Sequence, residues 1–307
     1  MSRAALAVAA TAAALAGCAG AAEYKTPLTT IPQNPRWLQI QEAMTPAVNH
    51  RDQNPCSQGS QACIDAVVAE MQRRFTKLAA ACDHRAPFAL MYMRVTEGVK
   101  APAAGRFGDQ AYLRHLDALF ARLYFRAFDA WQSGRRAQAP PAWRIAFDSA
   151  TTGRTSGIGD MLLGMNAHIS NDLPFALLDA GLTEAHGRSA QPDFDSVNNL
   201  LGDVQAPMIR EESRMFDLAI AKATLPYLGV YGGDVANVIA SWRTEAWQNG
   251  RKLIAARMPA ERAAVAAKIH RAAAQRAEVI QALASNRLLG TDPKARDGHC
   301  RAAAAAS

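Results

Sequence analysis

The stretch from Asp109 to Gln132, DQAYLRHLDALFARLYFRAFDAWQ, indicates the fold class. Asp109 can cap a helix, because its carboxylate can accept hydrogen bonds from backbone N–H groups of the first turn. Apolar residues then recur every three or four positions, the spacing of one helix face: Leu113, Leu116, Phe120, Leu123, Ala127 and Trp131. The stretch therefore predicts one long amphipathic helix.

Helical signals continue on both sides of this stretch, and strand signals are scarce. Ser60 can cap a helix with apolar residues from Ile64 to Leu78, and Pro87 can start another that reaches Val99. Further helices are predicted over 34–48, 143–149, 158–172 with a stop or kink at Pro174, from Asp193, and over 207–225, 234–257 and 260–286. The sequence thus predicts an all-α protein.

These helices are predicted to fill residues 34–290, as one multi-helix globular domain with bundle-like or orthogonal packing, or as two poorly separated domains. Residues 291–307 are expected to form a C-terminal tail. We find no internal repeat.

The first seventeen residues have the pattern of a signal peptide, with Arg3 followed by a short apolar run. The run is too short to anchor the chain across a bilayer, and it ends in Leu15-Ala16-Gly17-Cys18, which resembles a lipobox. We expect cleavage before Cys18, acylation of that cysteine with palmitate-like chains, and a tether over 18–33. An ordinary secretory peptide cut near residues 19–22 is the alternative. The lipobox predicts a lipoprotein held to a membrane of the bacterial cell envelope, facing the periplasm or the exterior.

Four cysteines remain after Cys18, and an even number in an exported chain suggests two disulfides. Three pairings are possible. The short interval favours Cys56 with Cys63, which would leave Cys82 to hold the C-terminal tail through Cys300. A zinc site built from these cysteines is disfavoured, because the chain has no Cys-x-x-Cys pair.

The formal net charge of +7 at pH 7 favours contact with anionic envelope surfaces. The arginines are scattered, however, without the compact basic run and interleaved aromatic residues of a nucleic-acid groove. We therefore expect a membrane contact through the N-terminal lipid and no nucleic-acid partner.

Polar residues on apolar helix faces point to a candidate site, because a buried polar group is costly unless it is paired. In the helix from Asp109, Asp117 falls on the apolar side, whereas His115 falls with the arginines of the wet face. In the helix over 158–172, Asp172 lies in or beside the apolar stripe and His168 flanks it one turn earlier, while Asp160 points the opposite way.

Two interpretations of His168 and Asp172 follow from their spacing. A histidine and an aspartate four residues apart can hold one metal ion, or the carboxylate can orient the imidazole as a base. A hydrogen-bonded pair at a helix end, with no ligand, is the alternative. The sequence leaves these interpretations open.

Glu97 lies on the second apolar side of a helix that is apolar on two sides. It is expected to be a semi-buried acid, or an edge residue paired with an arginine. If Glu97, Asp117, His168 and Asp172 meet, they could bind a divalent metal such as zinc and activate water. Otherwise an arginine must compensate the acids, and the candidates are Arg94, Arg144 and Arg154.

Four stretches, in this order, resemble a bacterial family called domain of unknown function 5995. They are MYMRVTEGV from Met91, YLRHLDALFARLYFRAF from Tyr112, GMNAHISNDLP from Gly164 and DFDSVNNLL from Asp193, and the resemblance runs from Ile64 to Leu201. It implies that the family's signature polar positions are Thr96, Glu97, Asp117, Asn166, His168, Asp172, Asp193 and Asn198. The resemblance implies no activity.

Two functions remain as hypotheses. The first is a membrane-tethered hydrolase in which His168, Asp172, Asp117 and Glu97 are catalytic or hold a metal, and Thr96, Asn166 and Asn198 bind substrate. The second is a non-enzymatic envelope protein that binds a small ligand or partner, with a polar cluster that only fixes helix register. The chain contains no Gly-x-Ser-x-Gly elbow and no His-Glu-x-x-His zinc helix.

Overall fold

A computed structural model describes residues 56–184, 187–222, 235–285 and 292–305. The predicted signal peptide, Cys18, the tether and the helix predicted over 34–48 lie outside these ranges. None of the described helices combines the length and the apolar character needed to cross a membrane.

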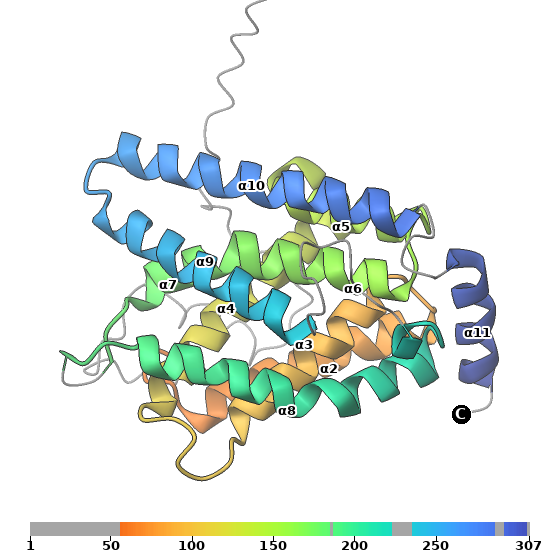
Figure 1. The fold of residues 1–307 in the computed structure, drawn as a ribbon, viewed down its shortest axis with the longest axis horizontal. Coiled ribbons are helices and arrows are strands. Elements are labelled where there is room, and N and C mark those ends of the chain that lie inside the picture. Colours follow the sequence, from red (N-terminus) through yellow and green to blue (C-terminus); the bar gives the residue numbers. More distant parts are fainter. Residues whose placement is uncertain (1–55, 185–186, 223–234, 286–291, 306–307) are drawn as a thin grey trace, which may run out of the picture.

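Helices make up most of the described chain (Figure 1). The α-helices are α2 (Gln61–Ala80), α3 (Ala86–Lys100), α4 (Gln110–Gln132), α5 (Pro141–Thr151), α6 (Gly157–Met165), α7 (Leu173–Ala180), α8 (Gln191–Met215), α9 (Val235–Ala255), α10 (Pro259–Ser285) and α11 (Pro293–Ala305). A π-helix, η2 (Asn166–Asp172), joins α6 to α7, and short 3₁₀ turns are η1 (Arg136–Gln138) and η4 (Ile220–Lys222). Within the described ranges the β-pairing consists of an isolated bridge between Thr183 and Ser189. The all-α prediction is confirmed.

One hydrophobic core runs through the described helices, with α10 on one side and α2 and α8 on the other (Figure 1). The long helix α4 begins as predicted, because Asp109 accepts a hydrogen bond from the Tyr112 amide. Its predicted apolar stripe is buried, and so is that of α2, which Ser60 caps. Helix α3 is buried on two sides, as expected from its sequence.

Two residues predicted to face solvent are instead buried. His115 is covered by the loop at the start of the described chain, where its Nδ1 lies 2.7 Å from the carbonyl oxygen of Cys56. Asp160 is buried against His84, at a distance of 2.7 Å. The helical pattern alone missed both, because each is covered by a segment distant in sequence.

The helical path does not end before Pro174 but continues from η2 into α7. Helix α7 ends at Ala180, and the residue that follows, Gly181, has φ +80°. A proline disrupts a helix interior because it lacks an N–H group and clashes with the preceding turn. Here Pro174 lies in the first turn of α7, where a missing N–H is tolerated. The π-helix thus places His168 and Asp172 at the junction of two helices. Such π segments are frequent at functional sites.

Helix α8 is one helix, although a start at Asp193 and a separate helix from Pro207 were predicted. Pro207 lies inside α8 on an exposed face, where water can solvate the backbone carbonyl that loses its partner. Asp193 does not cap α8; it accepts hydrogen bonds from the amides of Gly108 and Asp109, 2.8 and 2.5 Å away. It therefore holds α8 against the start of α4.

Both disulfides have the favoured pairing, Cys56 with Cys63 and Cys82 with Cys300. The second bond ties α11 to the loop between α2 and α3. Arg296 of α11 is fully buried there and donates hydrogen bonds to the carbonyl oxygens of Cys82 and Asp83. Much of the segment predicted as a tail is therefore a helix packed on the domain.

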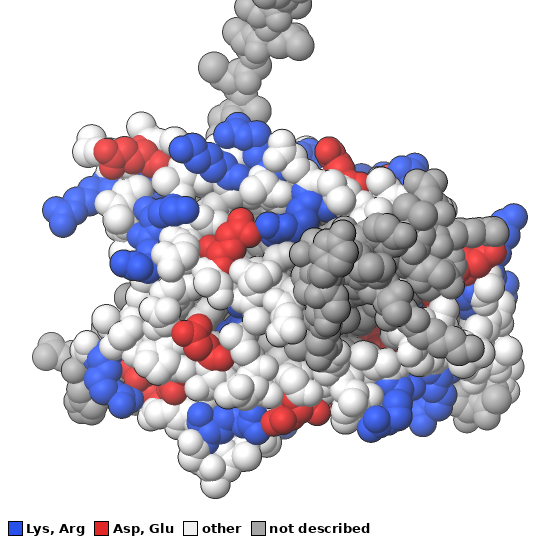
Figure 2. All heavy atoms as spheres, viewed as in Figure 1, with Lys and Arg blue, Asp and Glu red and all other residues white. Residues whose placement is uncertain are grey.

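Basic and acidic side chains are interspersed on the face of the molecule shown in Figure 2. Several of the arginines on the described surface are paired, for example Arg94 with Glu211 and Arg106 with Asp203. On the face shown, basic side chains therefore lie among acidic ones.

Candidate functional site

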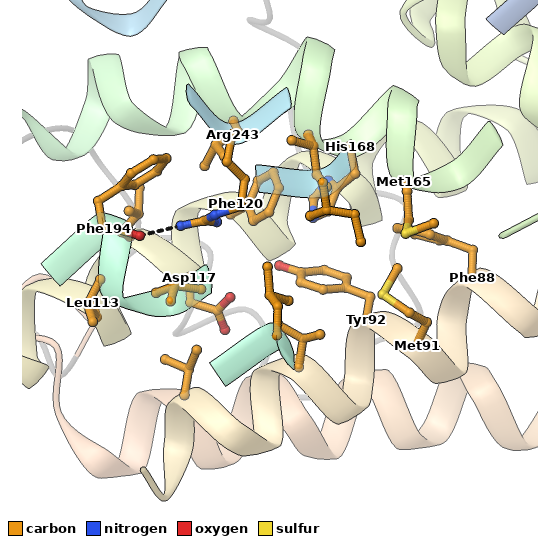
Figure 3. Close-up of a pocket in the computed structure, with 18 residues that line it drawn as sticks. Phe88, Met91, Tyr92, Leu113, Asp117, Phe120, Met165, His168, Phe194 and Arg243 are labelled. Atoms are coloured by element: carbon orange, nitrogen blue, oxygen red, sulfur yellow. Dashed lines mark hydrogen bonds between the residues drawn. The ribbon is translucent and has the colours of Figure 1, made fainter. Parts of the chain in front are cut away.

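A pocket of about 70 Å³ lies among α3, α4, η2, α8 and α9, with one residue each from the adjoining ends of α6 and α7. Its lining is apolar except for four side chains, those of Tyr92, Asp117, His168 and Arg243, which Figure 3 shows around one space. The apolar residues are Phe88, Met91, Val95, Val99, Leu113, Leu116, Phe120, Met165, Ile169, Leu173, Phe194, Val197, Leu201 and Ile239. An apolar lining with a few convergent polar groups is typical of small-molecule sites, although this volume is below their usual range of about 300–1,000 Å³.

His168 and Asp172 form the hydrogen-bonded pair that their spacing predicted. Nδ1 of His168 lies 3.1 Å from Oδ2 of Asp172, and both side chains are 2% exposed. Asp172 also accepts hydrogen bonds from Nε1 of Trp143 at 2.7 Å and Nδ2 of Asn171 at 2.8 Å. Trp143 and Asn171 both donate to this group, which fits a carboxylate that acts only as an acceptor, so the third contact requires a donor on His168. The His168 proton is therefore on Nδ1.

The other ring nitrogen of His168, Nε2, is buried and makes no hydrogen bond to any described residue. The imidazole stacks on the Phe120 ring, with centroids 3.4 Å apart, and lies 4.3 Å from the Tyr92 ring. Burial lowers the pKa of His168, although Asp172 opposes that shift. His168 is thus a neutral, oriented imidazole with a free lone pair at a pocket that its ring lines.

Asp117 provides a carboxyl group on the opposite wall, from α4 (Figure 3). Burial raises the pKa of Asp117 to about 7, while the nearby Thr96 hydroxyl and the charge of Arg243 oppose the shift. Its Oδ2 atom makes no hydrogen bond within the described chain. A carboxyl group of this kind can exchange a proton near neutral pH.

Arg243 of α9 was not predicted as a site residue. It is 7% exposed and donates hydrogen bonds to Oδ1 of Asn198 at 2.9 Å and the carbonyl oxygen of Phe194 at 2.6 Å. Its guanidinium also lies 4.2 Å from the centre of the Phe194 ring. Burial lowers the pKa of Arg243 to about 10. The residue remains a cation, held by neutral acceptors at the pocket wall.

A pattern in the sequence could have revealed Arg243. Ile239, four residues earlier, and Trp247, four residues later, are both buried, so Arg243 lies in the apolar stripe of α9. Of the three arginines proposed to compensate the acids, Arg94 does so for Glu97, whereas Arg144 and Arg154 do not. Arg94 binds Glu97 and Glu211 at the edge of α3, and Arg144 and Arg154 are exposed.

The structure brings together some of the predicted residues and not others. Glu97 is half-buried and paired with Arg94, 2.8 Å away, which is the edge position left open from the sequence. Thr96 is buried close to Asp117, and Asn198 binds Arg243. Asn166 is buried but donates to the carbonyl oxygen of Ala273, on the α10 side.

The four residues proposed as metal ligands are not gathered around one point. Among the described residues, no group of three or more His, Cys, Asp or Glu side chains could hold a metal ion. The arrangement instead offers an oriented base, His168, a carboxyl group that titrates near pH 7, Asp117, and a buried cation, Arg243. This set suits proton transfer on a bound substrate.

No curated protein and no solved structure matches the chain significantly. A family model, described as a family of unknown function (DUF5995), matches residues 64–283. The match reaches beyond Leu201, where the resemblance seen in the sequence ended, and includes α9 and therefore Arg243. All seven elements that line the pocket fall inside it. The chain belongs to the family of unknown function DUF5995.

Proposed function

We propose that this protein is a lipid-anchored hydrolase of the bacterial cell envelope, in which His168 activates water at the apolar pocket. One observation carries the proposal: Asp172 holds Nδ1 of His168, while the buried Nε2 has no described partner at the pocket. A neutral imidazole oriented by a carboxylate is the usual general base of hydrolytic sites.

The chemistry proposed for the pocket is hydrolysis of an ester. Nε2 of His168 takes a proton from water, and the water oxygen attacks the electrophilic carbon or phosphorus atom of the substrate. The bond to the leaving oxygen breaks, and the protonated form of Asp117 supplies a proton to that oxygen. The imidazolium then passes its proton through solvent to Asp117, which restores both groups. No cofactor is required by these steps.

The anchor rests on the sequence, because Cys18 lies outside the described residues. Arg3, the apolar run and the Leu-Ala-Gly-Cys ending support export and acylation, and the two disulfides suit an oxidising compartment. Labelling with radioactive palmitate tests the anchor. We expect the label on the wild-type protein and none on Cys18→Ser, and equal labelling of the two would refute the anchor.

Hydrolysis is tested with chromogenic probes, p-nitrophenyl esters of short fatty acids and p-nitrophenyl phosphodiesters. We expect His168→Gln to lower kcat/KM by roughly 100- to 10,000-fold, the usual contribution of a general base. Thr244→Ala, a change on an exposed part of α9, is the matched control and should keep full activity. If the wild type hydrolyses no probe, or His168→Gln equals it, the proposal fails.

The pH profile gives a second test. His168 must be neutral, so the rate should rise with pH through a pKa below the usual value of about 6.5. Asp117 must be protonated, so the rate should fall again above about pH 7, where burial places its pKa. Asp117→Asn should lower the rate, because it removes the proton donor, and the activity that remains should show no alkaline fall, because an amide does not titrate.

A binding protein without catalysis is the second candidate, and the largely apolar lining of the pocket favours it. It predicts that ligands bind but that no probe is hydrolysed. His168→Gln would then change affinity, with no rate to lose.

A further inference from the structure

We propose that the ligand of this pocket is an anionic amphiphile, with a carboxylate or phosphate group bound by Arg243 and an apolar chain along the lining of α3, α4 and α8. For the substrate, this inference rests on the function proposed above, and it narrows the substrate to a class. The binding itself does not depend on catalysis.

The first observation is that Arg243 is a buried cation with no carboxylate in direct contact among the described residues. A guanidinium does not lose its proton at physiological pH, and a buried ion is costly unless a counter-ion is near. Among the described residues, no carboxylate lies within 4.0 Å of this guanidinium; its hydrogen-bond partners are an amide oxygen and a backbone carbonyl. The remaining nitrogen, Nη1, makes no hydrogen bond within the described chain. The site therefore has room for an anion from outside.

The nearest pocket acid does not fill this role. Burial brings the pKa of Asp117 to about 7, so at neutral pH the carboxyl group is protonated for much of the time. Asp195 and, to a smaller extent, Asp117 act on Arg243 electrostatically, without a direct bond. In the protonated form, Asp117 can donate a hydrogen bond to an anionic oxygen instead of repelling it.

Tyr92 adds a further donor at the same place. Its hydroxyl is buried, makes no hydrogen bond that satisfies normal geometry within the described chain, and points into the space shared with Asp117 and Arg243 (Figure 3). Burial raises the pKa of Tyr92 well above its usual value, so the hydroxyl keeps its proton. One fixed cation with two O–H donors is a set that recognises carboxylate or phosphate oxygens.

The remaining lining defines the other half of the ligand. All but four of the side chains around the pocket are apolar, and a small inorganic anion would leave these surfaces in contact with water. An alkyl or acyl chain attached to the anion would cover them. The anion binds at Arg243, and the chain extends over the leucine, valine and phenylalanine side chains.

The test is calorimetric titration of the full chain carrying Cys18→Ser, which cannot be acylated at that position. The probes are octanoate, octyl phosphate, the neutral octanol, and the short anions acetate and inorganic phosphate. We expect at least tenfold tighter binding of one or both eight-carbon anions than of octanol or the short anions. The comparison of octanoate with octyl phosphate identifies which head group the pocket prefers.

Variants assign the effect to one residue. Arg243→Gln should weaken binding of the preferred anion at least tenfold while leaving octanol affinity within about twofold. Arg122→Gln, an arginine of α4 paired with Asp179 outside the pocket, is the matched control and should bind like the parent. Arg243→Lys keeps the charge and should recover part of the affinity. Equal affinity for octanol and the anions, or no loss in Arg243→Gln, overturns the inference.

The outcomes separate this inference from the proposed hydrolase. Binding of the anions without hydrolysis of any ester would refute the hydrolase and leave the inference standing. If the wild type hydrolyses neutral esters and Arg243→Gln does not change that rate, the hydrolase stands and the inference is refuted. If Arg243→Gln does not fold, the comparison of octanol with the anions on the parent chain still decides the question.

Discussion

His84 and His168 are both buried histidines that contact a buried aspartate, yet their surroundings differ in one respect. Both ring nitrogens of His84 are occupied, Nδ1 by Asp160 at 2.7 Å and Nε2 by Asp297 of α11 at 2.9 Å. In His168 only Nδ1 is occupied, and aromatic rings pack around the imidazole.

This difference reverses the direction in which the two pKa values move. Burial opposes the charged form of both rings. At His84 the Asp160 carboxylate outweighs burial, with help from Asp297, and the pKa is raised. At His168 one carboxylate does not outweigh burial, and the pKa is lowered.

A histidine between two carboxylates is thus favoured in its charged form, and here it bridges the C-terminal helix α11 to the body of the domain. A histidine with one carboxylate and one open nitrogen is a base. The comparison teaches that a His–Asp contact alone does not identify a catalytic pair. Whether the second ring nitrogen is occupied or open distinguishes a bridging histidine from a base.

The largest difference in activity between the two pairs should appear when the aspartate of each is replaced. Asp172→Asn removes the carboxylate that holds the His168 tautomer, and we expect kcat/KM for p-nitrophenyl esters to fall roughly 100-fold or more. Asp160→Asn should change kcat/KM less than twofold, because His84 does not reach the pocket. Steady-state kinetics on folded variants measures both. Equal losses would remove the distinction between the pairs.

The free energy of unfolding should depend more on the His84 site, although activity depends more on the His168 site. His84→Ala leaves Asp160 buried without its cation, and breaking one side of a buried pair costs about 3 kcal/mol or more. Asp297→Asn affects a carboxylate that is 37% exposed, so its cost should stay within about 1 kcal/mol. Urea unfolding, with the free energy extrapolated to water, measures both values. A smaller loss for His84→Ala than for Asp297→Asn would contradict the bridge.

The pH dependence of stability should have opposite signs at the two sites. A raised folded pKa means that His84 contributes stability below about pH 6.5 and loses it as the pH rises through the folded pKa. A lowered folded pKa means that His168 contributes above about pH 6.5 and loses it as the pH falls. Unfolding of the wild type, His84→Gln and His168→Gln between pH 5 and 8 isolates each contribution, and slopes of the same sign would refute the contrast.

Local sequence patterns predicted much of this fold, because its helices begin at ordinary caps and bury periodic stripes. Ser60 and Asp109 start their helices as expected, and Asp117, His168 and Asp172 are buried as the helical wheel predicted. Each of these features depends on residues within a few turns of the same helix.

Features that depend on distant segments could not be predicted in the same way. Asp160 was placed toward solvent because its partner His84 is 76 positions away, and His115 because its cover is the Cys56 loop. The π-helix depends on how α6 and α7 pack against the rest of the core. Arg243 was visible in its own helix pattern, but nothing local indicated which pocket it faces.

Nitrogen-15 NMR of the histidine rings tests the central claim most directly, because it reports the protonation of each ring nitrogen. We predict that at pH 7 His168 is neutral, with its proton on Nδ1 and a pKa below about 6.5, while His84 titrates above that value. Assignments come from His168→Gln and His84→Gln. A His168 ring that carries its proton on Nε2, or on both nitrogens at pH 7, would contradict its role as the base.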